Sequence, residues 1–122
     1  MKIFLILAIL NGFLSVALGA FGAHGLEGKV SEKGLEQWGK AVDYQMFHTM
    51  ALFVTALLMG KAQTGLMTGA GWMFMIGIVL FSGSLYIYAT TGIKTFAMIT
   101  PLGGLSFLIG WILLGYAVIK YI

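Results

Sequence analysis

The sequence contains no cysteine, no arginine and only one proline. Without cysteine the chain can form no disulfide, no thiolate metal site and no cysteine nucleophile. Charged residues are also scarce, at 9% of 122 residues, whereas soluble domains carry about 25%. The lysines are scattered singly, so the basic cluster that nucleic-acid binding needs is missing. These absences argue against a soluble domain and exclude nucleic acid as an expected partner.

Hydrophobic residues dominate instead, at 60% of the chain with a mean hydropathy of +0.99. A membrane-spanning helix needs about 20 predominantly apolar residues. Uncharged runs predict four spans, at residues 3–23, 44–60, 66–89 and 101–119. The first run resembles a signal peptide, but it exceeds the usual apolar region of about 7–15 residues, so we expect it to be retained. We predict an all-α membrane protein, with one compact four-helix bundle over residues 1–122.

One strongly polar segment, Glu27–Asp43, separates the first two spans. The Ser31 hydroxyl can cap a helix, and apolar residues follow it at helical spacing. This pattern predicts a short amphipathic helix over residues 31–42, lying on the membrane surface with Trp38 at headgroup level. Because interior glycines weaken helices, a loop is the alternative.

The dipeptide Thr100–Pro101 predicts the start of the fourth span. Threonine is a common helix cap, and proline at the first helical position gives up an N–H that would have no partner. The apolar residues Phe96–Ile99 then form either an extra helical turn or a short interfacial segment.

Small residues recur at helical spacing within all the long apolar runs. Because lipid provides little hydrophobic drive between helices, small residues that allow close backbone approach select the packing faces. The predicted helix-packing positions are Gly12, Ser15, Gly19, Gly22, Gly69, Gly77, Gly83, Gly103, Gly104 and Gly110.

Four spans place both termini on one side of the membrane. Lys2, Lys61 and Lys120 then lie on that side, and the other four lysines lie on the opposite side. The positive-inside rule counts basic residues and does not decide between these sets. The free amino terminus favours cytoplasmic termini, and we expect a multi-pass protein of the plasma (inner) membrane.

Four sequence blocks, one on or beside each span, carry a family resemblance. They are Gly19–Leu26 (GAFGAHGL), Tyr44–Gln45 with His48 and Ala51, Phe81–Tyr86 (FSGSLY) and Thr100–Gly104 (TPLGG). With these blocks the chain resembles the family called domain of unknown function 423, small bacterial membrane proteins related to animal transmembrane protein 256. The resemblance implies a four-span membrane fold and brings no activity or catalytic residue with it.

The interiors of the spans contain no Asp, Glu, Lys or Arg. Intramembrane ionisable groups mark proton relays and ion pathways, so their absence argues against an ion-driven pump. Paired carboxylates for acid–base catalysis are missing, and no Ser or Thr stands in a recognisable nucleophile motif. We therefore predict that the protein is not an enzyme. An enzyme acting on lipid would need a base that the sequence does not identify.

Two histidines lie where the first span ends and the second begins, so we expect both at the same leaflet. Together with nearby amides and hydroxyls they form the candidate polar site: His24, Gln45, His48, Ser82, Ser84 and Tyr86. Two interpretations remain open. These side chains form hydrogen bonds between helices, or they converge on a pocket for a small ligand.

Metal chemistry has three sequence-level alternatives. Two histidines on two helices could ligate haem, and Met46, His48 and Met50 form a pattern suited to Cu(I). Zinc would need loop acids as further ligands. Methionine usually fills irregular gaps in a core, and nothing else in the sequence indicates a cofactor. We expect no metal and no cofactor.

The sequence favours a non-enzymatic structural or accessory membrane component that packs through its glycine-rich faces. Its expected partners are the lipid bilayer and a second copy or another membrane protein. The alternative is a small channel or carrier for a neutral or soft solute, lined by the six residues of the candidate polar site. A continuous path past those side chains would favour transport, whereas a closed hydrogen-bonded cluster would favour the accessory role.

Overall fold

The computed structural model describes residues 1–122 as a bundle of long helices without strands. The helices are α1 (Lys2–Gly25), α2 (Glu32–Met59), α3 (Gly65–Gly77), η1 (Ile78–Gly83), α4 (Ser84–Thr91) and α5 (Lys94–Tyr121). Because α3, η1 and α4 follow one another without a break, they form a single span. Four helical segments are thus long and apolar enough to cross a membrane, which confirms the predicted four-span bundle.

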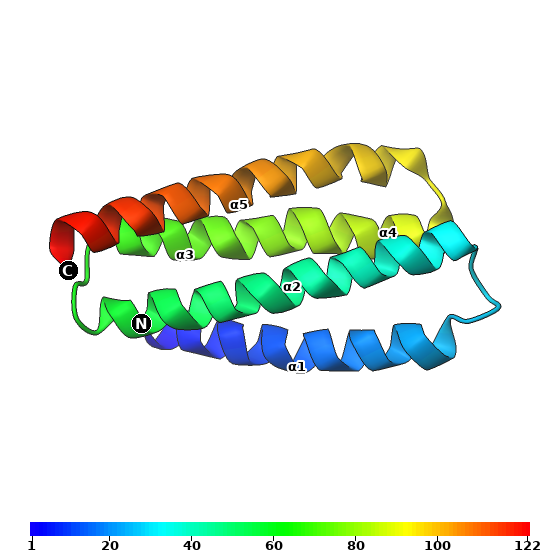
Figure 1. Ribbon diagram of the computed structural model, residues 1–122, viewed down its shortest axis with the longest axis horizontal. Helices are drawn as coiled ribbons and strands as arrows, with labels where there is room; N and C mark the ends of the chain where they lie inside the picture. Colours follow the sequence, from blue (N-terminus) through cyan, green and yellow to red (C-terminus); the bar gives the residue numbers. More distant parts are fainter.

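The four spans lie side by side in the order of the sequence (Figure 1). α1 packs on α2, α2 packs on the span formed by α3, η1 and α4, and that span packs on α5. The two chain termini lie at the same end of the bundle, as four spans require (Figure 1). Spans that follow one another in the sequence therefore pack on one another, and both α2 and α5 pack on the third span.

The contact seam of α2 repeats every three and four residues, as in a coiled coil. Its buried positions include Gly34, Trp38, Ala41, Gln45, His48, Leu52, Thr55 and Met59. The buried face of α1 has the same spacing, with Phe4, Ala8, Asn11, Ser15 and Gly22. Large side chains such as Phe13 and Leu57 point outward, where lipid would meet them. The uncharged polar residues Asn11, Ser15, Gln45, His48, Thr49 and Thr55 therefore face the bundle interior.

Several glycines permit close helix contacts at the predicted positions. An added Cβ would overlap Trp38 at Gly22, Phe107 at Gly77, the backbone of Phe81 at Gly103 and Phe74 at Gly110. At Gly12, Gly19, Gly69 and Gly104 the nearest atoms would lie 3.3–3.9 Å away. Gly83 has no neighbour within 4 Å of such a Cβ, so it makes no close contact of this kind. Gly71, absent from the prediction, packs on the ring of Phe4.

Residues 32–42 are helical, but the prediction of a separate surface helix over 31–42 is wrong, as is the loop alternative. Ser31 does cap a helix, since its side chain accepts a hydrogen bond from the Gly34 amide, and that helix is α2 itself. At 1.5 Å per residue α2 is about 42 Å long, longer than the roughly 30 Å hydrocarbon layer. Its charged first turns can therefore lie beyond the hydrocarbon without a break in the helix.

Trp38 lies inside the bundle rather than on an interfacial surface. Its exposed fraction is 7%, and its indole N–H donates to the Leu18 carbonyl of α1 at 2.8 Å. The ring of Tyr86 packs against it from α4, with centroids 4.6 Å apart. Trp38 therefore joins α1, α2 and α4.

The predicted start of the last span at Thr100–Pro101 is also wrong. α5 begins at Lys94, so Phe96–Ile99 are helical and Pro101 lies within the helix. The Thr100 hydroxyl does not cap α5, but lies 2.6 Å from the Ser84 hydroxyl of α4. Proline is tolerated inside membrane helices because neighbouring groups compensate for the lost backbone hydrogen bond. The turn before α5 is made instead by Gly92, whose φ of 71° is left-handed.

The third span contains a π-helical turn, η1, which was not predicted from the sequence. Such turns widen a helix locally and occur often at functional sites. Here the turn carries Phe81 and Ser82. Phe81 lies against Gly103 of α5, and the Ser82 hydroxyl donates to the Ala41 carbonyl of α2 at 2.7 Å. The widened turn therefore contacts both of its neighbouring helices.

Candidate functional site: an aromatic groove between α2 and α5

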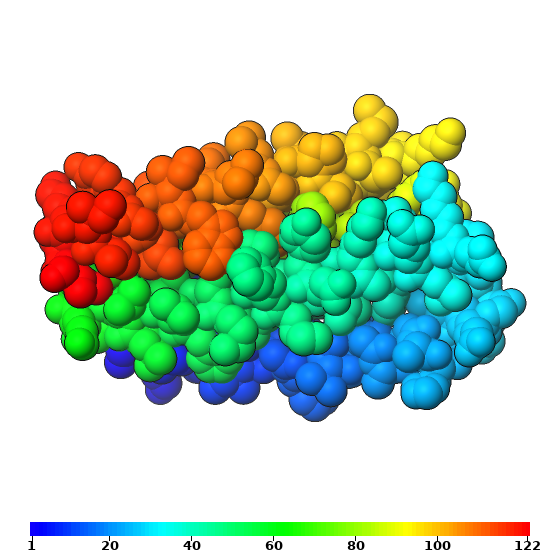
Figure 2. Space-filling model, viewed as in Figure 1, coloured from blue at the N-terminus to red at the C-terminus, as the bar shows by residue number.

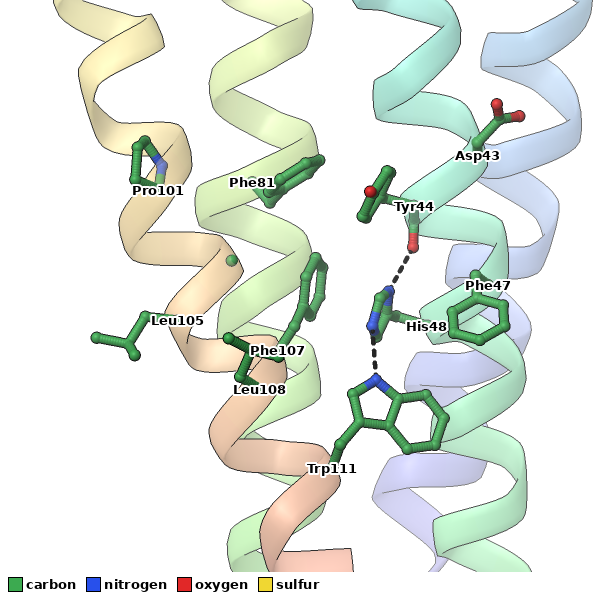
Figure 3. A pocket seen from close by; sticks show the side chains of 11 residues that line it. Asp43, Tyr44, Phe47, His48, Phe81, Pro101, Leu105, Phe107, Leu108 and Trp111 are labelled. Carbon is green, nitrogen blue, oxygen red and sulfur yellow. Dashed lines mark hydrogen bonds between the residues drawn. The ribbon is translucent and has the colours of Figure 1, made fainter.

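A groove with a volume of about 930 Å³ lies between α2 and α5 (Figure 3). Both helices lie toward the viewer in Figure 2, and the third span, on which both pack, lies behind them. The groove is lined by Asp43, Tyr44, Phe47, His48, Phe81, Pro101, Gly104, Leu105, Phe107, Leu108 and Trp111. Volumes of 300–1,000 Å³ with mainly apolar walls and few polar groups are typical of small-molecule sites.

His48 is held in one orientation by contacts on all sides. Its Nδ1 lies 2.8 Å from the Tyr44 carbonyl, and its Nε2 accepts a hydrogen bond from the Trp111 indole at 3.0 Å (Figure 3). The imidazole stacks on the Phe107 ring, with centroids 3.5 Å apart and planes 6° apart. Because an indole nitrogen can only donate, Nε2 carries the lone pair and Nδ1 carries the proton. Both ring nitrogens are therefore occupied.

Gln45 is the centre of a second hydrogen-bonded group behind the groove. Its Nε2 donates to Asn11 Oδ1 at 2.9 Å, and its Oε1 accepts from the Tyr86 hydroxyl at 2.6 Å. The Asn11 amide nitrogen in turn donates to the Leu7 carbonyl at 2.8 Å and lies 3.4 Å from the Met75 sulfur. This group joins α1, α2, α3 and α4.

The serine hydroxyls also bond within the bundle. Ser84 lies 2.6 Å from the Thr100 hydroxyl and 3.0 Å from the Phe81 carbonyl. Ser106, which the prediction did not include, donates to the Met73 carbonyl at 2.7 Å and joins α5 to α3. Ser15 donates to the Asn11 carbonyl of its own helix. Each of these hydroxyls already has a partner.

His24 does not join this cluster, contrary to the expectation that the two histidines share a leaflet. It lies exposed in the last turn of α1, whereas His48 is 3% exposed and lies near the middle of α2. Thr49, beside His48, packs on Gly12 of α1, which is 12 residues before His24. At 1.5 Å per residue this is about 18 Å along the helix. The two histidines therefore cannot share a pocket or ligate one haem.

The copper pattern Met46, His48 and Met50 also fails to converge. Residues two apart on a helix point in different directions, whereas residues four apart share a face. Accordingly Met46 and Met50 are 46% and 59% exposed, and His48 is buried on the other side of α2. No three histidine or carboxylate side chains lie close enough to hold a metal ion, which also removes the basis for the zinc alternative.

The six predicted polar residues therefore fall into separate places. Only His48 lines the groove, Gln45 and Tyr86 belong to the group behind it, Ser82 and Ser84 bond to other helices, and His24 lies at the end of α1. They do not line one route through the bundle. No buried side-chain nitrogen or oxygen lacks a hydrogen-bond partner. The buried polar side chains are thus paired within the bundle, in several separate groups.

Two partners in these groups, Asn11 and Trp111, were missed as site residues. Asn11 is the only asparagine and lies in the middle of the first span, where a buried amide needs a partner on another helix. That signal was present in the sequence, although the position suggested only small-residue packing. Trp111 had no such signal, because tryptophan is common both in lipid-facing and in buried positions of membrane helices.

Comparisons with known proteins agree with this architecture. A family described as "Protein of unknown function (DUF423)" matches residues 18–104. The UPF0382 membrane protein YwdK of Bacillus subtilis is 52% identical over the full length of both chains. The UPF0382 membrane protein SERP0230 of Staphylococcus epidermidis is 48% identical, over 99% of this chain and 98% of the relative.

The same identity, 48% over 99% of this chain, is found with the UPF0382 membrane protein SAB0533 of Staphylococcus aureus. No solved structure matches the chain. The relatives are named membrane proteins, in agreement with the four apolar spans. The family match and the full-length identity lead to one conclusion: this chain is a multi-pass membrane protein that belongs to the DUF423 family of proteins of unknown function.

Proposed function

We propose that this protein is a non-enzymatic structural or accessory component of the plasma (inner) membrane. The observation that carries the proposal is the complete internal pairing of buried polar side chains. In a transport or catalytic site, polar groups usually stay available for a solute or a reacting atom. Here they form hydrogen bonds between helices, which is the use expected of polar residues that stabilise a membrane bundle.

The distribution of carboxylates supports the non-enzymatic part of the proposal. Glu27, Glu32, Glu36 and Asp43 are all exposed, and all lie between the end of α1 and the middle of α2. The buried hydroxyls donate to carbonyl oxygens or pair with each other, so none lies beside a base. A general base within hydrogen-bond reach of its target is the minimum requirement for acid–base catalysis.

The proposed partners are the lipid bilayer and a second copy or another membrane protein. The close glycine contacts at Gly22, Gly77, Gly103 and Gly110 are made within one chain. An association between chains would therefore use the outward faces, where Gly115 has no neighbour within 4 Å of an added Cβ. Nucleic acid is not proposed as a partner, because the lysines form no cluster. The termini are proposed to face the cytoplasm.

Quantitative co-purification tests the accessory role. The protein is extracted from native membranes in a mild detergent, and its companions are compared with those of a tagged, unrelated four-span protein. The proposal expects a stoichiometric membrane-protein companion or a homo-oligomer, and a lower abundance of the companion complex after deletion of the gene. A purified protein that turns over a lipid, or that moves a solute across liposome membranes, would contradict it.

A further inference from the structure

A second hollow, with a volume of about 410 Å³, lies between α1 and α2. Its only charged residues are two carboxylates, Glu27 and Asp43, and both are exposed. The Asp43 carboxylate points away from the aromatic groove, toward α1 (Figure 3). The other lining residues are Gly19, Gly22, Ala23, Leu35, Trp38, Gly39 and Val42. The hollow is therefore lined by small and apolar residues, with negative charge as its only charge.

Asp43 lies well inside α2 rather than before it. The second span was predicted to begin after this residue, whereas α2 begins at Glu32 and ends at Met59. At helical rise Asp43 is about 16 Å from the first of these residues and about 24 Å from the last. A hydrocarbon layer of roughly 30 Å that starts level with Met59 would therefore reach about 6 Å past Asp43. The structure places this carboxylate at membrane depth.

The neighbouring spans carry no charge at this depth. Val42 lies beside Gly19 of α1, and no Lys, Asp or Glu follows Gly19 within α1. Ser82 of the third span donates to the Ala41 carbonyl, and the third span is uncharged over its whole length. Neither of the helices that pack on α2 can therefore supply a basic partner to Asp43 at this level.

Asp43 also has no ionic partner on its own helix. The only salt bridge in the chain joins Lys40 to Glu36, at 3.9 Å. A carboxylate at membrane depth is costly beside lipid, and such residues almost always face a water-filled cavity or a partner. Because Asp43 has no partner and borders the hollow, the hollow is the place where water can hydrate its charge.

We propose that the hollow between α1 and α2 holds water and brings a small hydrated cation to Asp43 within the membrane. The hollow begins at Glu27, in the turn between the two helices, where a second carboxylate attracts cations. Beyond Asp43 the two helices are joined by the hydrogen bond from Gln45 to Asn11 Oδ1. The site is therefore blind and does not pass a cation through the bundle. It goes beyond the structural role proposed above, which does not depend on it.

Thiol reactivity tests the proposal, because the chain has no cysteine of its own. Gly39→Cys places a thiol in the hollow, one helical turn from Asp43, where an added Cβ meets no atom within 4 Å. The variant is placed in nanodiscs, which expose both membrane faces, and is treated with two methanethiosulfonates of similar size. One reagent carries a trimethylammonium group and the other a sulfonate. Each rate is divided by the rate of the same reagent with a small thiol in solution, and the cation should then react about tenfold faster than the anion.

Leu102→Cys is the matched control for depth. Leu102 is 59% exposed and does not line the hollow. It precedes Gly103, which packs on Phe81, the neighbour of Ser82 in the third span, so it lies close to the level of Asp43. Its thiol should face lipid and react with neither charged reagent until the protein is denatured. Reaction of this variant in nanodiscs would place the level outside the hydrocarbon and would overturn the proposal.

Removal of the carboxylate measures its contribution. In the Gly39→Cys protein, Asp43→Asn should lower the ratio of the cation rate to the anion rate by about threefold or more. Glu32→Gln, on the same helix but outside the hollow, should leave the ratio unchanged. Asp43 is exposed, so Asp43→Asn should fold. An unchanged ratio in Asp43→Asn would overturn the proposal.

A thiol at Gly39→Cys that reacts only after denaturation would also overturn the proposal, because the hollow would then be filled by lipid rather than by water. Ala23→Cys lines the same hollow from α1 and is exposed, so it repeats both measurements if Gly39→Cys does not fold.

Discussion

The indole N–H of Trp111 donates to Nε2 of His48 at 3.0 Å, and this hydrogen bond joins α5 to α2 across the groove. The backbones of these two helices hardly approach each other, because the third span separates them. The contact between α2 and α5 is therefore made by side chains, chiefly the stacked ring of Phe107 and this hydrogen bond.

Trp111→Phe should lower the free energy of unfolding by about 1–2 kcal/mol, because it leaves the His48 acceptor without a donor. Equilibrium unfolding in mixed micelles measures the change. Trp72→Phe is the matched control, since Trp72 is 41% exposed and forms no side-chain hydrogen bond. In a double-mutant cycle with His48→Phe, which keeps a ring against Phe107, Trp111→Phe should lower the free energy of unfolding less than it does in the unmodified protein. Strict additivity would show that the hydrogen bond contributes nothing.

The same hydrogen bond predicts the tautomer of His48. Nitrogen NMR of the labelled protein should show a protonated Nδ1 and an unprotonated Nε2, because Nε2 accepts from the indole. In Trp111→Phe the Tyr44 carbonyl still accepts from Nδ1, so the same tautomer is expected, with a shifted Nε2 resonance because this nitrogen has lost its donor. A protonated Nε2 in the unmodified protein would contradict the arrangement.

Gln45→Leu should destabilise the bundle by about 1–3 kcal/mol. The substitution leaves Asn11 Oδ1 and the Tyr86 hydroxyl without their partner, and buried polar groups without partners carry the full desolvation cost. Gln63→Leu, in the exposed turn before α3, is the control and should change stability by less than about 0.5 kcal/mol. Adding Asn11→Leu to Gln45→Leu should cost less than it does alone. If Asn11→Leu lowers stability more in the Gln45→Leu background than in the unmodified protein, the two side chains are not paired.

Gly103→Ala should destabilise the bundle by about 1–3 kcal/mol, because its Cβ would overlap the backbone of Phe81 in η1, which cannot rotate away. Gly115→Ala has open space and should be neutral or stabilising by up to about 1 kcal/mol, since alanine is the better helix former. Thermal unfolding in detergent compares the two. Equal stability of both variants would mean that α5 does not approach η1 as described.

The number of spans and most close glycine contacts could be predicted from the sequence. Long uncharged runs are needed to cross the hydrocarbon layer, and small residues allow helices to approach closely in lipid. The sequence did not decide the structure where one local pattern is compatible with two conformations. Proline is acceptable both at a helix start and inside a membrane helix, and only the structure, in which α5 begins at Lys94, shows which applies here. A charged segment can likewise lie on the membrane or extend a spanning helix, as the first turns of α2 do.

The candidate site was predicted only in part, for a related reason. The spans are apolar on every side, so hydrophobic periodicity does not indicate which face of a helix is buried. Gln45 and His48 were found because polar side chains in a span need partners. The groove itself is made by Phe47, Phe107 and Trp111, which look the same in sequence whether they face lipid or a neighbouring helix. The two histidines were expected at one leaflet because the second span was predicted to begin at residue 44, whereas α2 begins at Glu32 and His48 therefore lies near its middle.

The orientation of the bundle can be tested with introduced thiols, because the chain has no cysteine of its own. Gln63→Cys lies in the turn at the end that holds both termini, and Thr91→Cys lies at the opposite end, at the last residue of α4. Neither substitution changes a charge, so the number of lysines on each side of the membrane stays the same and the orientation should not change. Ala56→Cys is fully buried and should not react until the protein is denatured.

With cytoplasmic termini, a membrane-impermeant maleimide should label Thr91→Cys in intact cells and Gln63→Cys only after permeabilisation. The reverse pattern would place the termini outside while keeping the four spans. Labelling of both variants in intact cells would place both ends of the third span on the same side of the membrane. Because α3, η1 and α4 form one continuous helical segment, that result would contradict the four-span arrangement itself.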